Sequence, residues 1–339
     1  MLNIAEKQIA TPILLAPLAG ITDLPFREVV AGFGAGLVVS EMVASQEMVQ
    51  AKPSARGKAE LGLGAENTAV QLAGCDAHWM AEAARVVADN GARIIDINMG
   101  CPAKRVVSAG GAGASGSALM RDLDHALRLI EAVVAAVDVP VTLKTRLGWD
   151  DTRLNAPELG RRAESAGVAM ITVHGRTRCQ FYRGAADWAA ISEIVEAVNI
   201  PVIANGDVTS VDSARRAVAQ SGAAGVMIGR GARGRPWLLA EVAAAMGHGT
   251  PPEAPRGTAL VDLVAAHYEA MLGFYGRDLG LRVARKHLGW YMEAAHSAEG
   301  VRRAVLTAET PKDVLGLLPD AMAGGDPARK EDQDARAAA

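Results

Sequence analysis

Polar side chains follow short apolar runs at several places along this chain, and their chemistry could build an active site. Cys101 comes just after one such run, where a thiol with an ordinary pKa of ~8.5 could act as a general acid. One such polar residue is usually a hydrogen-bonded core group or a helix cap, and a lone cysteine is often a small buried side chain. A set drawn from separate runs instead indicates one shared site. Its members are Glu41, Gln71, Asn98, Lys144, His174, Asn205 and Arg230.

Glycine-rich segments predict where a phosphate could bind. The segment Gly229–Gly234 (GRGARG) leaves an apolar run directly and enters a helical stretch, so its backbone N–H groups could hold a phosphate at a helix N-terminus. Asn205–Asp207 (NGD) ends the preceding run and would complete such a cup. The other GxGxxG segment, Gly111–Gly116, lies too far beyond its run for a dinucleotide-binding turn. A flavin mononucleotide (FMN) fits this arrangement.

Three side chains of the set would suit a flavin at that place. Lys144 would put positive charge near the N1–C2=O edge, where a reduced flavin concentrates negative charge. Gln71 could hydrogen-bond the pyrimidine edge of the ring, and His174 could reach the phosphate or the ribityl chain. The alternatives are that Lys144 only pairs with a carboxylate and that His174 is structural.

The elements that would position these side chains alternate between strand and helix. Eight short apolar runs are separated by amphipathic stretches, several of which begin with Asp and end at Gly or Asn, as capped helices do. Strands that are apolar on both faces, each followed by a helix, predict a parallel sheet covered by helices. Eight such units predict an α/β protein with a closed (β/α)8 TIM barrel, whose C-terminal strand ends meet at one mouth. The structural alternative is an open, doubly wound sheet.

The pattern changes after the barrel. We expect a catalytic domain over 11–246, a proline-containing linker, an all-helical C-terminal domain over 256–319 and a disordered tail over 320–339. From Arg277 to Arg303 the helical part holds six Lys and Arg against three Asp and Glu, a net charge of +3 in a chain whose net charge is −3. Such a stretch is either a solvated helix face or a surface that binds phosphates.

The composition limits the class of protein. Of the 339 residues, 50% are hydrophobic, which allows a sizeable core, and the 3 cysteines lie far apart without a CxxC pair. This pattern argues against a disulfide framework and a zinc site and favours a reducing compartment. No apolar stretch is long enough to cross a membrane. We therefore expect a cytoplasmic monomer with no bound metal and no membrane association.

Longer motifs run in order from Ile13 to Leu239 and include DINMGCPAKRV, LKTRLGW, HGRTRCQFYRGAADW, PVIANGD and MIGRGARGRPWL. Together they resemble those of the bacterial tRNA-dihydrouridine synthases, most closely the B-type branch. The resemblance implies a TIM barrel that binds FMN, a helical RNA-binding domain and NADPH as reductant. By position, it implies an FMN site lined by Leu18, Ala19, Gly20, Gln71, Lys144, His174, Asn205, Gly206, Asp207, Gly229 and Arg230. Two features depart from the family pattern: Leu18 stands where Met is usual, and the loop after Cys101 is a few residues longer.

The activity implied by the resemblance is the reduction of uridine to 5,6-dihydrouridine in the D-loop of tRNA. Reduced FMN would deliver hydride to C6 and Cys101 would give the proton to C5. The uridine must be flipped out of the tRNA fold to react, and phosphate contacts would offset that cost. We assign RNA contacts to Arg176, Arg178, Arg282, Arg285 and Lys286.

Two other functions stay open at this point. The chain could be another FMN barrel, similar to a dihydroorotate dehydrogenase, that acts on a free small molecule. It could also be an RNA-binding flavoprotein without catalysis. The helical domain argues against the first, and the combination of Cys101, Lys144 and Gln71 argues against the second.

The tract Val107–Ser117 is rich in Gly, Ala and Ser, with little apolar area to offset the entropy lost on ordering. We expect it to be mobile without tRNA and hypothesise that it closes over the flipped uridine as a lid.

Overall fold

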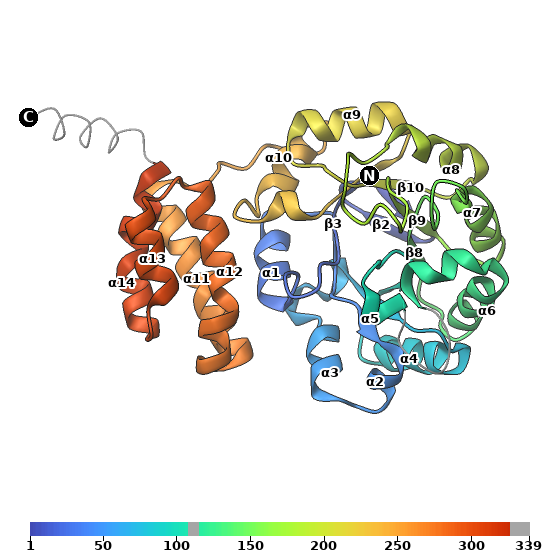
Figure 1. The fold of residues 1–339 in the computed structure, drawn as a ribbon, viewed down its shortest axis with the longest axis horizontal. Coiled ribbons are helices and arrows are strands. Elements are labelled where there is room, and N and C mark those ends of the chain that lie inside the picture. The colour runs from blue at the N-terminus through green and yellow to red at the C-terminus, as the bar shows by residue number, and fades with distance from the viewer. Residues whose placement is uncertain (108–114, 326–339) are drawn as a thin grey trace, which may run out of the picture. The chain divides into compact units, whose positions relative to one another are not determined.

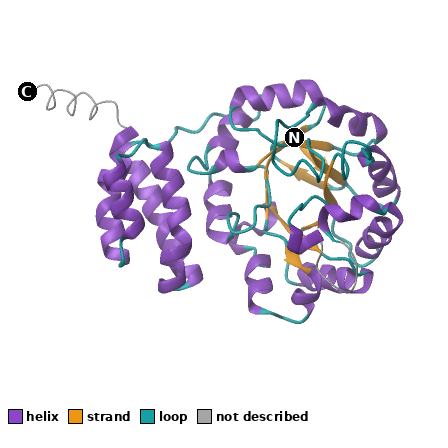
Figure 2. Cartoon of the chain, viewed as in Figure 1, coloured by secondary structure: helices purple, strands orange, loops and turns teal. Residues whose placement is uncertain are grey.

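The computed structural model of the protein describes residues 1–107 and 115–325. The chain divides into two compact units. The first consists of Met1–Gly231 with Leu239–Pro251, and the second of Ala232–Leu238 with the residues from Pro252 onward. Within the first unit a ring of strands is surrounded by helices, and the second is a group of helices (Figure 1, Figure 2). Residues 232–238, which we expected in the barrel domain, thus group with the second unit.

Each of the eight apolar runs contains one strand of a closed parallel barrel. In chain order the strands are β3 (Ile13–Leu15), β4 (Leu37–Val39), β6 (Thr68–Ala73), β7 (Ile94–Asn98), β8 (Val141–Arg146), β9 (Met170–His174), β10 (Val202–Asn205) and β11 (Gly225–Ile228). The last strand, β11, pairs in parallel with the first, β3, and β4 pairs with β6, so the ring is closed. The short β5 (Val43–Ala44) lies beside the end of β6. The predicted TIM barrel is confirmed, and the open-sheet alternative is wrong.

Helices follow the strands of the barrel. They are α1 (Leu24–Gly32), α2 (Ser45–Val49), α3 (Pro53–Ala59), α4 (Ala77–Asp89), α5 (Lys104–Val107), α6 (Leu123–Val134), α7 (Ala156–Ser165), α8 (Ser192–Ala197), α9 (Val211–Ser221) and α10 (Leu238–Ala245). Aspartates cap two of them as expected: the Asp76 and Asp122 carboxylates accept from the N–H groups of Trp79 and His125 at 3.1 and 2.9 Å.

The barrel interior has an apolar layer below a polar one. A hairpin of β1 (Leu2–Ile4) and β2 (Lys7–Ile9) packs with the lower strand residues in one buried cluster. The cluster contains Leu2, Ile4, Ile9, Leu14, Ala16, Leu37, Val39, Ala69, Ile94, Met170, Ile203 and Met227. Because side chains alternate between the two faces of a strand, the inward positions that follow these residues belong to the same face. They carry Gln71, Asp96, Asn98, Thr172, His174 and Asn205.

The described part of the second unit is helical, with α11 (Gly257–Tyr275), α12 (Arg277–Ala294), α13 (Glu299–Thr307) and α14 (Pro311–Met322). We expected the ordered helices to end at Pro319, but α14 continues through this proline to Met322. A proline in the last turn removes only one backbone hydrogen bond, and Ala321 and Met322 are buried, so the helix persists. Residues 326–339 of the expected tail lie outside the described residues. None of the helices described in either unit is long and apolar enough to cross a membrane.

A buried group of rings joins α11 to α12. His267 Nδ1 lies 3.0 Å from the Tyr291 hydroxyl, and the ring centroids of His267 and His287 are 5.0 Å apart. Burial lowers the pKa of His267 to about 4, and burial together with the charges of His267 and Lys286 lowers the pKa of His287 to about 2. Both imidazoles are therefore neutral in the folded unit at pH 7.

We expect the second unit to lose stability as the pH falls from about 6.5 towards about 4. In that range the unfolded chain binds protons on both histidines and the folded unit does not. The contribution to the free energy of unfolding is fully present above pH ~6.5 and falls by roughly 1 kcal/mol per pH unit for each histidine. Hydrogen exchange of α11 and α12, corrected for the intrinsic pH dependence of exchange, checks this. His287→Leu should weaken the pH dependence and His296→Gln, at an exposed position of the same unit, should not; equal dependence in both variants would contradict the assignment.

Candidate active site

Polar side chains of three neighbouring strands form one hydrogen-bond chain in the barrel mouth. The buried Asp96 carboxylate on β7 accepts from Thr142 Oγ1 on β8 and from Gln71 Nε2 on β6, both at 2.6 Å. Gln71 Oε1 accepts from Asn98 Nδ2 at 2.7 Å. Asn98 Oδ1 in turn accepts from the backbone N–H of Cys101 at 3.0 Å. The structure thus connects two predicted site residues, Gln71 and Cys101, through Asn98.

Cys101 is half-buried just beyond the end of β7. Its carbonyl oxygen accepts from Ser117 N at 3.0 Å and from Ser117 Oγ at 2.9 Å. Gly116 has a φ of +57°, and a Cβ there would lie 2.8 Å from Cys101 O, so glycine is required for this approach. The described end of the Val107–Ser117 tract therefore holds the Cys101 backbone. Residues 108–114, on which the lid hypothesis depends, lie outside the described residues.

Lys144 is buried in the mouth, and its ammonium group donates to Asn205 Oδ1 at 2.9 Å. Asn205 Nδ2 donates to the Met227 carbonyl at 2.8 Å, which orients the amide so that its oxygen faces the lysine. Burial and the charge of Arg146 lower the pKa of Lys144 to about 8, although Asp96 and Cys101 act in the opposite direction. Lys144 is therefore mostly protonated at pH 7, and among the described residues it makes no ion pair with a carboxylate.

Arg146 joins the Cys101 loop to the loop after β9. Its Nε donates to the Gly100 carbonyl at 2.8 Å, and its Nη1 donates to the carbonyls of Thr177 and Phe181 at 2.9 Å. Burial lowers the pKa of Arg146 to about 10, so the buried guanidinium stays charged at neutral pH. The sequence alone gives Arg146 no role, although it stands within the LKTRLGW motif.

Arg176 is a buried cation that pairs with Asp207. It is 1% exposed, and its guanidinium bonds both carboxylate oxygens of Asp207, His174 Nε2 at 3.2 Å, and the carbonyls of Arg183 and Gly184. Its donors face into the protein, which argues against the predicted RNA contact of Arg176. The signal that could have revealed this is the acidic residue of the NGD motif, which needs a cation beside it.

His174 is neutral at the centre of four cations. Burial is the largest cause that holds its pKa well below the ordinary value, followed by the charges of Lys144, Arg146, Arg176 and Arg230. Because a guanidinium only donates, Nε2 of the ring accepts from Arg176 and Nδ1 carries the proton. His174 can therefore donate one hydrogen bond to an anion in the mouth.

Asp207 and Tyr182 contact the guanidinium groups of the mouth. Burial raises the pKa of Asp207, but hydrogen bonds from Arg176 and from Ala186 N, with the charges of Arg176 and Arg230, outweigh it and keep that pKa below its ordinary value. The Tyr182 side chain is 51% exposed, and its ring lies 5.5 Å from the Arg146 guanidinium and 5.0 Å from that of Arg230. Tyr182 was also missed from sequence, since a lone loop tyrosine carries no special pattern.

The predicted residues of the first and last barrel loops lie next to each other. A Cβ at Gly229 would be 3.6 Å from a methyl carbon of Leu18, and Leu18 N donates to Thr22 Oγ1 at 2.9 Å. Gly20 N donates to the carboxylate of Glu41, another residue of the predicted set. A Cβ at Gly206 would lie 2.9 Å from His174 Cδ2, which explains glycine there. Ala19 and Gly20 are exposed in the same loop.

These residues could hold a phosphorylated flavin. The mouth offers a buried ammonium, a neutral imidazole that donates, an exposed guanidinium at Arg230 and loops with small residues at Gly206 and Gly229. Asp207 pairs with Arg176 and Arg230, while Lys144 and Arg146 bond neutral oxygens, so positive charge exceeds negative charge there and suits an anionic ligand. In the described parts of the chain, no group of three or more His, Cys, Asp and Glu side chains could hold a metal ion.

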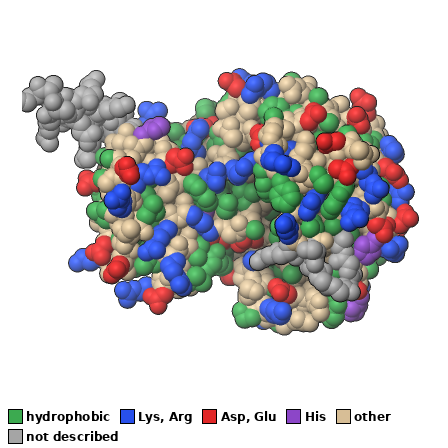
Figure 3. All heavy atoms as spheres, viewed as in Figure 1, with side chains coloured by type: hydrophobic (Ala, Val, Ile, Leu, Met, Phe, Trp, Pro, Cys, Tyr) green, Lys and Arg blue, Asp and Glu red, His purple; other side chains and the backbone are tan. Residues whose placement is uncertain are grey.

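Arg178 stacks on aromatic rings near the mouth. Its guanidinium lies 4.7 Å from the ring centroid of Trp149 and 5.1 Å from that of Phe181, and Arg121 lies 5.0 Å from the same Trp149 ring. On the face of the first unit in Figure 3, Lys and Arg side chains (blue) lie beside hydrophobic ones (green) near the middle. The other predicted RNA contacts are on α12 of the second unit: Arg282 is exposed, and Arg285 and Lys286 are half-buried.

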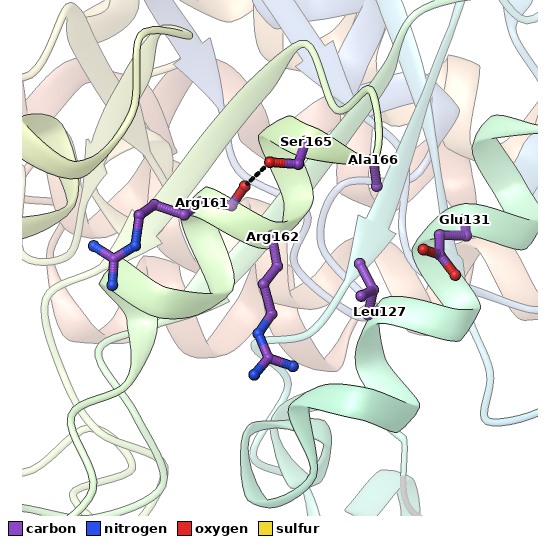
Figure 4. Close-up of a pocket in the computed structure, with 6 residues that line it drawn as sticks. All are labelled: Leu127, Glu131, Arg161, Arg162, Ser165 and Ala166. Carbon is purple, nitrogen blue, oxygen red and sulfur yellow. Dashed lines mark hydrogen bonds between the residues drawn. The ribbon is translucent and has the colours of Figure 1, made fainter.

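A surface groove between α6 and α7 contains none of the predicted site residues. Its lining comprises Leu127, Glu131, Arg161, Arg162, Ser165 and Ala166 (Figure 4). Arg162 is paired with Asp124 at 2.6 Å and with Glu158. Because its most evident cation is already paired, we assign this groove no role.

Comparison with known proteins gives a consistent result. A family model described as dihydrouridine synthase matches residues 14–323. A probable tRNA-dihydrouridine synthase of Rhodobacter capsulatus is 62% identical over 318 residues, covering 94% of this chain and 96% of that protein. A tRNA-dihydrouridine synthase B of Xanthomonas campestris is 45% identical, covering 94% of this chain and 95% of that protein.

Solved structures resemble the fold alone. A 2-naphthoyl-CoA reductase complex has a TM-score of 0.56 at 12% identity, covering 72% of this chain and 51% of that chain. A histamine dehydrogenase from Rhizobium sp. 4-9 has a TM-score of 0.52 at 13% identity, covering 76% and 48%. This chain therefore spans about half the length of each.

We expect Arg176→Ala to lower the free energy of unfolding by about 3 kcal/mol, because it leaves the Asp207 carboxylate without its main partner. Urea unfolding measures this, and Arg183→Ala, an exposed arginine of the same loop, is the matched control with little effect. A stable Arg176→Ala protein that binds tRNA weakly would restore the assignment of Arg176 as an RNA contact.

Proposed function

This chain belongs to the dihydrouridine synthase family, which makes it an oxidoreductase, and from that premise we propose that it reduces uridine in the D-loop of tRNA to 5,6-dihydrouridine. FMN is the proposed bound cofactor and NADPH the proposed reductant. The observation that carries the proposal is the position of Cys101, whose backbone is bonded to Asn98 and Ser117 at the barrel mouth.

The proposed FMN site is built from the predicted residues of the mouth. Lys144 would hold positive charge at the pyrimidine edge of the ring, and the second N–H of Gln71 Nε2 can face that edge. His174 Nδ1–H and Arg230 would bind the phosphate together with backbone N–H groups at Gly206 and Gly229. Bound and reduced, FMN supplies the hydride equivalent that C6 of uracil accepts.

Cys101 completes the reaction by giving its thiol proton to C5. The hydride and this proton saturate the C5=C6 bond and leave a thiolate. That negative charge interacts favourably with Lys144 and Arg146, both of which are buried close enough to respond to it. Solvent then reprotonates Cys101 before the next substrate reacts.

The aromatic and cationic groups around the mouth suit a nucleic acid. Guanidinium groups stacked on an aromatic ring keep their N–H edges for phosphate, as Arg121 and Arg178 can on Trp149. Tyr182 offers an exposed ring on which an extruded base can stack. The cations of α12 would add phosphate contacts that offset the cost of unstacking the uridine.

We expect the purified FMN-containing enzyme to add two hydrogens to uridine in an unmodified tRNA transcript when NADPH is present. Cys101→Ala should retain FMN and its reduction by NADPH but slow dihydrouridine formation by about 100-fold or more in a single turnover, because the proton donor is lost. Nucleoside mass spectrometry measures the product, and Cys75→Ala is the matched control.

Three outcomes would count against this proposal. Full activity of Cys101→Ala would remove the general-acid role. Reduction of free uridine as well as tRNA would favour a small-molecule oxidoreductase. A flavin that NADPH reduces without any dihydrouridine formation by the wild-type protein would favour a non-catalytic RNA-binding flavoprotein.

We expect the double variant Arg285→Ala with Lys286→Ala to bind tRNA more weakly while NADPH still reduces the flavin. If both are phosphate contacts, the slope of log affinity against log salt should flatten by roughly one unit per lost contact. Filter binding across a salt series measures both quantities, with Arg128→Ala on α6 as the control. Unchanged affinity and slope would make this helix face an ordinary solvated one.

A further inference from the structure

Asp96 is a buried carboxylate that no part of the proposed reaction uses directly. It is 2% exposed on the inner face of β7, between apolar Ile94 below and Asn98 above. Burial raises the pKa of Asp96, while the hydrogen bonds from Thr142 and Gln71 and the charge of Lys144 act against it. A buried carboxylate is costly to keep, so its partners indicate what it does.

The bonds of Asp96 set the direction of a whole chain of donors and acceptors. Both oxygens of Asp96 accept hydrogen bonds, one from Thr142 Oγ1 and one from Gln71 Nε2, so the NH2 group of Gln71 faces Asp96 and its oxygen faces Asn98. Asn98 must then turn its NH2 group to Gln71, which leaves its oxygen for the N–H groups of Gly100 and Cys101, at 3.3 and 3.0 Å. With Gln71 reversed, two NH2 groups would face each other.

We propose that Asp96 is a positioning residue that fixes the amide orientations of Gln71 and Asn98 and thereby holds the Cys101 backbone in place. The proposal rests on the function proposed above, since Cys101 matters there as the proton donor. The hydrogen-bond partners of Asp96 are Gln71 and Thr142, and in this proposal it acts on Cys101 through the amides of Gln71 and Asn98. The effect of Asp96 would pass through successive single hydrogen bonds, from Asp96 on the inner face of β7 to the Cys101 loop that follows this strand.

The alternative is that the negative charge of Asp96 matters, as a counter-charge for Lys144. Asp96→Asn separates the two explanations. An asparagine can present its oxygen to Gln71 and its NH2 group to Thr142, because the Thr142 hydroxyl can accept as well as donate. The charge is lost in this variant, yet the direction of every bond from Gln71 to Cys101 is kept.

The disrupting variant combines Asp96→Leu with Thr142→Val. Leucine has nearly the shape of aspartate, and valine removes the hydroxyl that would otherwise be left unpaired, so packing is preserved while Gln71 loses its acceptor. Thr142→Val alone is the control, because the bond from Gln71 to Asp96 survives it. Asp96→Ser replaces the double variant if that one does not fold, since a hydroxyl can donate or accept and therefore sets no direction.

The test follows the Cys101 loop in the FMN-bound protein without tRNA. Hydrogen exchange of the Gly100 and Cys101 amides should rise by about tenfold in the disrupting variant, as for a lost hydrogen bond, and stay close to wild type in Asp96→Asn and Thr142→Val. The rate at which iodoacetamide alkylates Cys101 should change in the disrupting variant. Cys75 and Cys179 in the same sample serve as internal references for this rate. The tRNA half-reaction should slow in parallel.

Two results would overturn the proposal. If exchange and alkylation in the disrupting variant match wild type, Asp96 does not position Cys101. If Asp96→Asn behaves like the disrupting variant, the charge rather than the bond direction is what the site needs. Exchange and alkylation are measured without substrate, so a protein that forms no dihydrouridine but passes this test contradicts only the proposed function.

Discussion

The parallel pairing of the last barrel strand, β11, with the first, β3, is the constraint on which the candidate site depends. It places Gly229 beside Leu18, although the two are separated by nearly the whole catalytic unit in sequence. Closure also turns every C-terminal strand end towards one mouth, where Lys144 of β8 reaches Asn205 of β10. In an open sheet the first and last strands would lie apart, and Gly229 would not lie beside Leu18.

A closed barrel must fill its own interior, and this one divides that task between two layers. The lower layer, covered by the β1–β2 hairpin, is aliphatic and contributes stability through burial. The upper layer holds charged groups that cost free energy to bury. Partners offset this cost: Thr142 and Gln71 bond Asp96. Backbone carbonyls bond Arg146, and Asp207 pairs with Arg176. The same bonds hold the polar groups in fixed orientations, which is what a preorganised site requires.

Local patterns in the sequence were sufficient for the elements and for the position of the mouth. Apolar runs and caps such as Asp76 and Asp122 depend on neighbouring residues alone, so the eight barrel strands were predicted where the structure has them, whereas the β1–β2 hairpin and the short β5 were not predicted. Cys101, Lys144 and Gln71 were also placed correctly at strand ends, because the ends of parallel strands share one edge. The extent of α14 was missed, since the burial of Ala321 and Met322 depends on other helices and overrides the proline signal.

Only the tertiary structure shows which side chains of different strands and loops pair with one another. Arg176 and Arg178 stand in one motif with the same side chain, yet Arg176 is buried against Asp207 and Arg178 stacks on Trp149. Asp96 likewise reads as one polar residue within an apolar run, and only closure brings Gln71 and Thr142 to its two oxygens. The sequence alone therefore indicated that polar residues near the strand ends, such as Lys144 and Asn205, reach the mouth, because that follows from local periodicity, whereas it did not reveal Arg146 or Tyr182. Which donor meets which acceptor depends on strand register and barrel closure, which join residues far apart in the chain.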